Sequence, residues 1–143
     1  MKKRSAAKRH KQPVFFIDRS LGKIDVPTAL RANGYCCELH DDCEIDGVRF
    51  DQDTEDEVWL KAVAVRDWIV LTKDERIRYR PAELGAIQAA GLRAFIVIAG
   101  NVRGAETANI LLKAMPKIIA AALSRKGPCV YYVYKDSTIK RIR

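Results

Sequence analysis

The stretch V-F-F-I-D-R-S-L-G, from Val14 to Gly22, joins a buried-strand pattern to a charged end. Its apolar start lacks polar alternation, which is typical of a strand in a parallel sheet that is buried on both faces. The run ends on the carboxylate of Asp18, and Arg19 follows directly. In open α/β sheets, ligands bind outside the carboxyl ends of the strands, near the point where the strand order reverses. Asp18 is therefore a candidate site residue.

Short apolar runs and segments with helical spacing alternate along the rest of the chain. The expected strands are 14–17, 35–39, 69–71, 94–98 and 130–134. The expected helices are 27–33, a segment opening at 54, 82–90 and 105–123, with a kink at Pro116. We expect the polar stretch 40–53 to be a loop. This order predicts a three-layer α/β/α sandwich around a mainly parallel five-stranded sheet, with strand order 2-1-3-4-5 if it is flavodoxin-like.

The positive charge of the chain lies at its two ends. The formal net charge is +8, of which residues 1–12 carry +6 and residues 135–143 carry +3, so that residues 13–134 are close to neutral at −1. We expect a flexible basic arm, one domain over 13–134 and a basic C-terminal tail. Each basic end either binds the phosphates of a nucleic acid or only increases the solubility of the protein. The chain has neither a secretory signal pattern nor an apolar run of membrane-spanning length, so we expect a cytoplasmic protein without membrane attachment.

Two further acids are candidates for the site that Asp18 suggests. The third apolar run, W-I-V-L-T-K-D, ends on Asp74, and in the expected strand order it neighbours the first. In T-E-D-E-V-W-L-K, Thr54 and Glu57 have capping-box spacing, whereas Asp56 extends the core-facing stripe of the helix to its first turn. A first-turn acid also stabilises a helix by itself, by about 0.3–1 kcal/mol. Both interpretations of Asp56 remain open from spacing alone.

Carboxylates gathered at one sheet edge need cations to remain ionised together. Mg²⁺ and Mn²⁺ prefer oxygen ligands, retain waters and bind substrate phosphates, which is the arrangement used in phosphodiester hydrolysis. Arginines follow the acids and could hold such phosphates, although a solvated basic face is the better explanation for any single one of them. These arginines are Arg19, Arg76, Arg78 and Arg80.

Four segments together resemble a known family. They are F-F-I-D-R-S-L-G, T-E-D-E-V-W-L, V-L-T-K-D-E-R-I-R-Y-R-P-A-E-L and A-G-N-V-R-G-A-E, in that order. In order and spacing they resemble PIN-like domains related to VapC-type toxins, over residues 13–134. The resemblance implies a ribonuclease dependent on Mg²⁺ or Mn²⁺, with Asp18, Asp56 and Asp74 as catalytic metal ligands. It also implies that RNA is the substrate, that Asn101 and Arg103 lie near the site, and that a cognate antitoxin is the partner of a type II toxin. A homodimer is compatible with the sequence.

The chain departs from this family at one acid. Many PIN domains have a fourth acid, a helical glutamate, and here only Glu38 and Asp42 lie in that region, on an expected strand or loop. The site could then hold one metal, or Glu57 could serve as a supporting acid. The departure also favours an alternative from another class, a non-catalytic nucleic-acid-binding or partner-binding module that keeps the fold.

A zinc site is the remaining pattern in the sequence. Y-C-C-E-L-H-D-D-C places Cys36, Cys37, His40 and Cys43 within eight residues. Structural zinc sites usually draw on two ligand pairs that a longer stretch separates. We therefore expect Cys36 and Cys37 to alternate between the two faces of a strand, with His40 at the start of the following loop.

Overall fold

The computed structural model describes residues 13–40, 44–45, 48–49, 56–74, 81–124 and 128–142. The predicted basic arm, residues 1–12, lies outside this set. The strands are β1 (Val14–Ile17), β2 (Cys36–Leu39), β3 (Glu44–Ile45), β4 (Val48–Arg49), β5 (Ile69–Thr72), β6 (Arg93–Ile98), β7 (Cys129–Tyr134) and β8 (Ile139–Arg141). The helices are the 3-10 turn η1 (Arg19–Leu21), α2 (Asp25–Ala32), α3 (Asp56–Val65), α4 (Pro81–Ala90) and α5 (Gly104–Ser124).

The main sheet has the predicted topology with one additional strand. Its order is β2-β1-β5-β6-β7-β8, and the first five strands in this order are parallel. This confirms the order 2-1-3-4-5 for the five expected strands, and strand order reverses between β1 and β5. The expected count of five is corrected to six, because β8 pairs antiparallel with β7 inside the segment predicted to be a tail.

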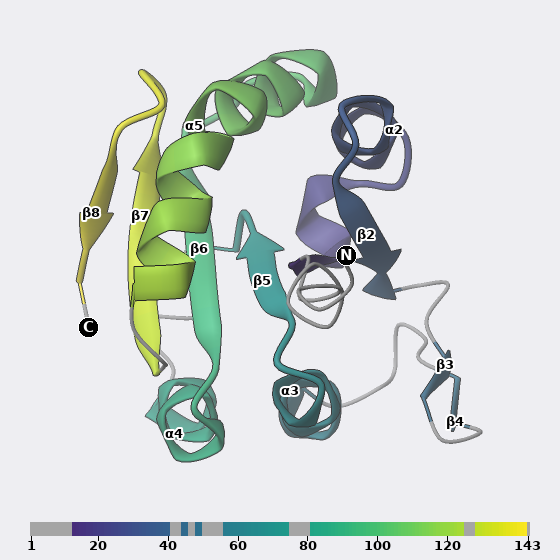
Figure 1. Ribbon diagram of the computed structural model, residues 1–143, viewed down its shortest axis with the longest axis vertical. Helices are drawn as coiled ribbons and strands as arrows, with labels where there is room; N and C mark the ends of the chain where they lie inside the picture. The colour runs from purple at the N-terminus through teal and green to yellow at the C-terminus, as the bar shows by residue number, and fades with distance from the viewer. Residues whose placement is uncertain are drawn as a thin grey trace, which may run out of the picture.

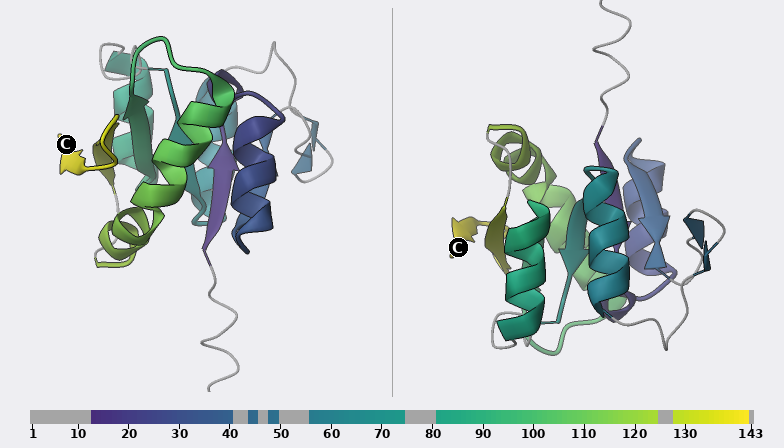
Figure 2. Two further views of the ribbon diagram at one scale, coloured as in Figure 1. Left: turned by 90° about the horizontal axis from the view of Figure 1, so that it is seen from above. Right: turned by 90° about the horizontal axis from the view of Figure 1, so that it is seen from below.

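Each face of the sheet carries two helices and its own hydrophobic core (Figure 1). Along β1, Phe15 and Ile17 pack toward α2 and α5, whereas Phe16 packs toward α3 and α4. All three side chains are buried. Burial on both faces explains why the strand has no polar alternation, and it makes the architecture a three-layer α/β/α sandwich. Figure 2 shows α2 and α5 side by side in one view and α3 and α4 in the other.

The helices end where the sequence predicts. Gly34 after α2 and Gly91 after α4 have φ of +87° and +72°. After α2, Tyr35 N donates to Leu30 O and Gly34 N to Arg31 O, which is a Schellman cap that favours glycine at the left-handed position. Helix α5 continues through Pro116 and changes direction near its middle (Figures 1 and 2), as the predicted kink requires. None of the helices in the described ranges is both long and apolar enough to cross a bilayer.

The polar stretch 40–53 is not entirely a loop. Strands β3 and β4 form a separate antiparallel pair with Ile45 opposite Val48. The two residues between these partners in the sequence are Asp46 and Gly47, a dipeptide that favours a two-residue hairpin. The expectation of a loop was wrong here because the strands are only two residues long, too short for an alternation pattern.

Candidate active site

Asp18 lies at the carboxyl end of β1, at the position where the strand order reverses. Ile17 pairs with Leu71 of β5, and Asp18 N donates to Leu71 O over 3.0 Å. The pairing between β1 and β5 therefore continues one residue beyond the strand and brings Asp18 level with Thr72. The fold places the first predicted acid at the sheet edge where ligands of open α/β proteins bind.

Three donors hold one oxygen of the Asp18 carboxylate. Its Oδ2 accepts hydrogen bonds from Ser20 N at 3.2 Å, Ser20 Oγ at 2.6 Å and Thr72 Oγ1 at 2.9 Å. The two hydroxyls also contact each other at 3.1 Å. Within the described part of the chain, every hydrogen bond to this carboxylate falls on Oδ2. The arrangement fixes the orientation of Asp18 and leaves Oδ1 available to a ligand.

The loop after β5 continues the same network. Ser20 Oγ accepts from Lys73 N at 2.8 Å, and Thr72 Oγ1 accepts from Asp74 N at 3.1 Å. Asp74, the second predicted acid, is half-buried at the end of the neighbouring strand. The Nζ of Lys73 donates to Val102 O at 3.3 Å and so links β5 to the loop between β6 and α5. Three strand ends are thereby connected at this edge.

The third predicted acid begins a helix that leads to the same edge. Asp56 is the first residue of α3 and Glu57 the second, while Thr54, the expected cap, lies outside the described residues. Only three residues separate α3 from β5, so the helix ends near the amino edge of the sheet and begins near its carboxyl edge. The described side chains contain no group of three or more potential metal ligands. The positions of the Asp56 and Glu57 side chains remain predictions.

The predicted phosphate-binding residues fall into two groups. Arg19 in η1, Asn101 in the β6–α5 loop and Arg103 just before α5 are exposed at the carboxyl edge. Arg76 and Arg78 lie outside the described residues. Of the two acids considered for the fourth PIN position, Glu38 is exposed on β2 and Asp42 also lies outside the described residues.

Ser20 and Thr72 are site residues that the sequence reasoning missed. Each hydroxyl lies two residues from an acid, in D-R-S and in T-K-D. Short polar side chains at this spacing commonly form local turns, as the bonds from Ser20 to Asp18 and from Asp74 to Thr72 do here. That spacing was the available signal. The bond between Thr72 and Asp18 joins residues 54 positions apart, and only the β1–β5 register reveals it.

The cysteine-rich stretch behaves as a strand. Cys36 is exposed and Cys37 buried, as expected from alternation along β2, and His40 is buried after the strand. Burial raises the pKa of the Cys37 thiol to about 11, partly offset by Arg31. Because zinc binds thiolates, this environment disfavours Cys37 as a ligand. Cys43 lies outside the described residues.

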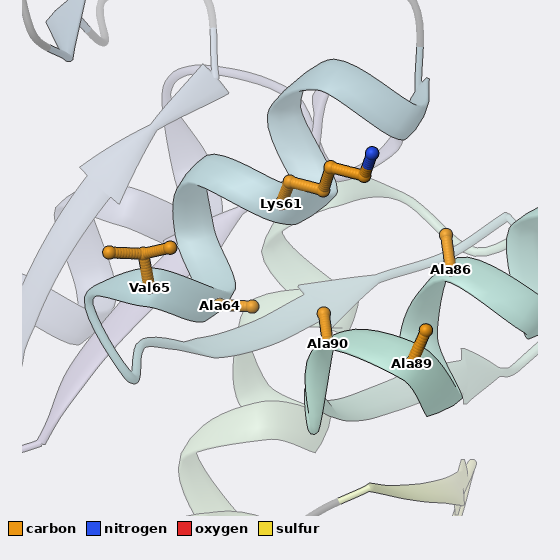
Figure 3. A pocket seen from close by; sticks show the side chains of 6 residues that line it. All are labelled: Lys61, Ala64, Val65, Ala86, Ala89 and Ala90. Atoms are coloured by element: carbon orange, nitrogen blue, oxygen red, sulfur yellow. The ribbon is translucent and has the colours of Figure 1, made fainter.

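A cavity elsewhere on the molecule has a different chemical character. It has a volume of about 330 Å³ and lies between α3 and α4 (Figure 3). Its lining is Lys61, Ala64, Val65, Ala86, Ala89 and Ala90. Five of these described lining residues are apolar and the sixth is Lys61, so their side chains offer no oxygen ligand to a cation. The carboxyl edge of the sheet is therefore the candidate active site.

A known protein family matches the sequence of this chain, in agreement with the fold and with the acidic residues at the carboxyl edge. A family model described as "PIN like domain" matches residues 13–99, which is more than half of the chain and extends from the residue before β1 to the residue after β6. The chain belongs to the PIN-like domain family. This confirms the resemblance seen in the sequence.

One curated relative extends the match almost to the whole chain. The protein named "Putative ribonuclease VapC45" from Mycobacterium tuberculosis is 30% identical over 125 residues, which cover 87% of this chain and 88% of that protein. A match of this length must extend beyond residue 99 and include α5. No solved structure matches the chain.

Proposed function

We propose that this protein is a metal-dependent endoribonuclease that hydrolyses RNA phosphodiester bonds. The observation that carries the proposal is the Asp18 carboxylate, at the end of the strand beside the one that leads to Asp74. The described residues hold this carboxylate through Oδ2 and form no hydrogen bond with Oδ1. Hydrogen bonds to one oxygen orient the carboxylate, and the other oxygen can then bind a ligand. The name of the Mycobacterium tuberculosis relative supports the same activity.

The residues at this edge suit a hard divalent cation. Mg²⁺ is usually bound through one or two carboxylates together with waters and substrate phosphates, and Asp18 and Asp74 supply two such groups. Asp56 is proposed as a third ligand and Glu57 as a supporting acid. When bound, Mg²⁺ or Mn²⁺ would lower the pKa of the attacking water and offset the phosphate charge.

The chain's own residues would orient the acids and the RNA. Ser20 and Thr72 hold the carboxylate of Asp18, and Lys73 holds the β6–α5 loop through Val102 O. We propose that exposed donors around this edge bind the phosphates that flank the scissile bond. These donors are Arg19, Asn101 and Arg103, together with Arg76 and Arg78 from the following loop.

We further propose that the enzyme acts in the cytoplasm as the toxin of a type II toxin–antitoxin pair. The support is the resemblance of the four quoted segments to VapC-type toxins, together with the family match. A cognate antitoxin would then cover the acidic edge and restrain cleavage until it is removed.

Cleavage of a mixed pool of structured and single-stranded RNAs tests the proposed activity. The protein is expected to cut RNA with Mg²⁺ or Mn²⁺ and to lose this activity in EDTA. A pool of DNA with the same sequences is expected to remain intact. RNA binding without cleavage under every metal condition would reject the enzyme and favour a binding module with the PIN-like fold.

Ser20→Ala is expected to lower the cleavage rate about 10–100-fold, the range typical of residues that support a metal ligand. The variant loses the 2.6 Å donor to Asp18 and the acceptor of Lys73 N. Because Ser20 positions a ligand, the Mn²⁺ concentration that gives half-maximal rate should rise as well. The measurement is a Mn²⁺ titration of the initial cleavage rate.

Two matched variants accompany Ser20→Ala. Ser20→Thr keeps a hydroxyl and should retain most of the activity. Ser124→Ala removes a hydroxyl whose one bond to the described residues is to Ala121 O, near the end of α5, and this variant should cut RNA at the wild-type rate. An unchanged Mn²⁺ requirement in Ser20→Ala would contradict the positioning role.

A further inference from the structure

A second cavity, of about 280 Å³, lies between α5 and the turn that joins β7 to β8. The lining side chains from α5 follow its 3.6-residue spacing, and those from the turn are consecutive in the sequence. The lining is Glu106, Asn109, Ile110, Lys113, Lys135, Asp136 and Ser137. The described lining of the cavity between α3 and α4 has one amine, that of Lys61, whereas this lining has two amines, an amide and two carboxylates.

The cavity opens at the same sheet edge as the proposed active site. β7 is parallel to β6, so its last residue, Tyr134, lies at the carboxyl edge, and Lys135 follows at once. Three strand spacings separate β1 from β7, which is about 14 Å at the usual distance between strands. A strand of RNA that passes Asp18 could therefore reach this cavity with another of its phosphates.

Hydrogen bonds fix the two walls of the cavity to each other. The buried Ser137 has a φ of +69°, and its Oγ donates to Ile110 O of α5 at 2.9 Å. Lys117 Nζ donates to Ser137 O at 3.4 Å from the same helix. The turn is thus attached to α5, and the spacing between Lys113 and Lys135 is set by the fold.

The charged side chains of this cavity differ in the partners that they already have. Asp136 Oδ1 accepts from Thr138 Oγ1 at 2.6 Å and from Thr138 N at 3.0 Å, and these bonds lower the pKa of Asp136. These bonds fall on Oδ1 and hold the turn, and the lowered pKa keeps the Asp136 carboxylate negatively charged. By contrast, neither Lys113 nor Lys135 has a hydrogen-bond acceptor or ion-pair partner within the described ranges. Glu106 is the other acid of the lining.

We propose that this cavity binds a backbone phosphate of the RNA other than the scissile one, an inference that rests on the proposed ribonuclease function. Lys113, Lys135 and the amide of Asn109 would supply the donors. Contacts of this kind position a nucleic acid without reading its sequence, and they weaken as salt rises. The negative charges of Glu106 and Asp136 would repel the phosphate and limit the affinity of the site.

RNA binding by charge variants tests this subsite. A fluorescent single-stranded RNA is titrated with each protein in EDTA and in Ca²⁺ at several salt concentrations, and anisotropy reports the Kd. The double variant Lys113→Gln/Lys135→Gln should bind about 10-fold more weakly, with a salt slope smaller by about 0.7–1.4. Glu106→Gln should bind about 2–5-fold more tightly, because it removes a like charge beside the phosphate.

Lys61→Gln is the matched control, since Lys61 lies on α3 across the sheet and its loss should leave the Kd unchanged. Wild-type affinity and salt slope in the double variant would overturn the subsite, as would the absence of RNA binding by the wild type in both buffers. Polyglutamate serves as a second probe. Loss of its binding in the double variant, with RNA binding intact, would assign the cavity to an acidic protein segment and also overturn the proposal.

Measurements on the same proteins distinguish failure of the phosphate subsite from failure of the proposed ribonuclease function. Cleavage by the wild type in Mn²⁺, with equal RNA affinity in wild type and double variant, rejects the subsite and retains the ribonuclease. Weakened RNA binding in the double variant, with no cleavage by the wild type, supports the cavity as an RNA contact and rejects the ribonuclease.

Discussion

Asp18→Asn is expected to reduce metal-dependent RNA cleavage by at least about 100-fold, more than the loss typical of residues that only support a ligand. Asparagine keeps an oxygen that can accept the bonds from Ser20 and Thr72, so the local structure should persist. What disappears is the negative charge that a divalent cation requires. Initial rates on the RNA pool in Mn²⁺ measure the effect, and Asp74→Asn should behave similarly.

A matched control neutralises an acid at the opposite edge of the sheet. Asp67 lies in the turn between α3 and β5, so Asp67→Asn should cut RNA at the wild-type rate. If the protein is a toxin, inducible expression in bacteria should arrest growth with the wild type and with Asp67→Asn, but not with Asp18→Asn. Full metal-dependent cleavage by purified Asp18→Asn would remove Asp18 from the proposed ligand set.

The second large effect concerns stability and centres on Arg93. This arginine begins β6 and is only 7% exposed. Its Nη1 donates to Ala122 O of α5 at 2.7 Å, and its Nη2 donates to Asp67 O and Asp67 Oδ1, both at 2.9 Å. One side chain thus ties the sheet to the end of α5 and to the turn after α3.

Arg93→Met is expected to lower the free energy of unfolding by about 2–4 kcal/mol, because it removes three bonds from a charged donor and leaves two carbonyls without it. Urea unfolding followed by tryptophan fluorescence measures the change. Asp67→Asn should cost less than about 1 kcal/mol, because its side chain is 85% exposed and asparagine tolerates the φ of +60° at this position. Equal stabilities of the two variants would show that the buried carbonyl bonds contribute little.

Several features of the fold could be predicted because they depend on local patterns. β1 spans Val14–Ile17 as expected, since its unbroken apolar run suits a strand buried on both faces. Gly34 and Gly91 end their helices as expected, because each adopts a positive φ. The short edge strand β8 was missed, because Ile139 is its only apolar residue and its backbone pairing with β7 leaves no side-chain pattern.

By itself, the sequence determined the parallel α/β class and an acid at the end of each of two strands, because apolar periodicity marks the strands and parallel strands bring their carboxyl ends to one edge. The strand order was expected only for a flavodoxin-like sheet, and the pairing of β1 with β5 confirmed it. Only the tertiary structure decided that Thr72 holds Asp18, that Arg93 caps α5 and that Lys113 lies across a cavity from Lys135. Such contacts depend on strand register and helix packing, which join residues far apart in the chain, and local patterns do not encode them.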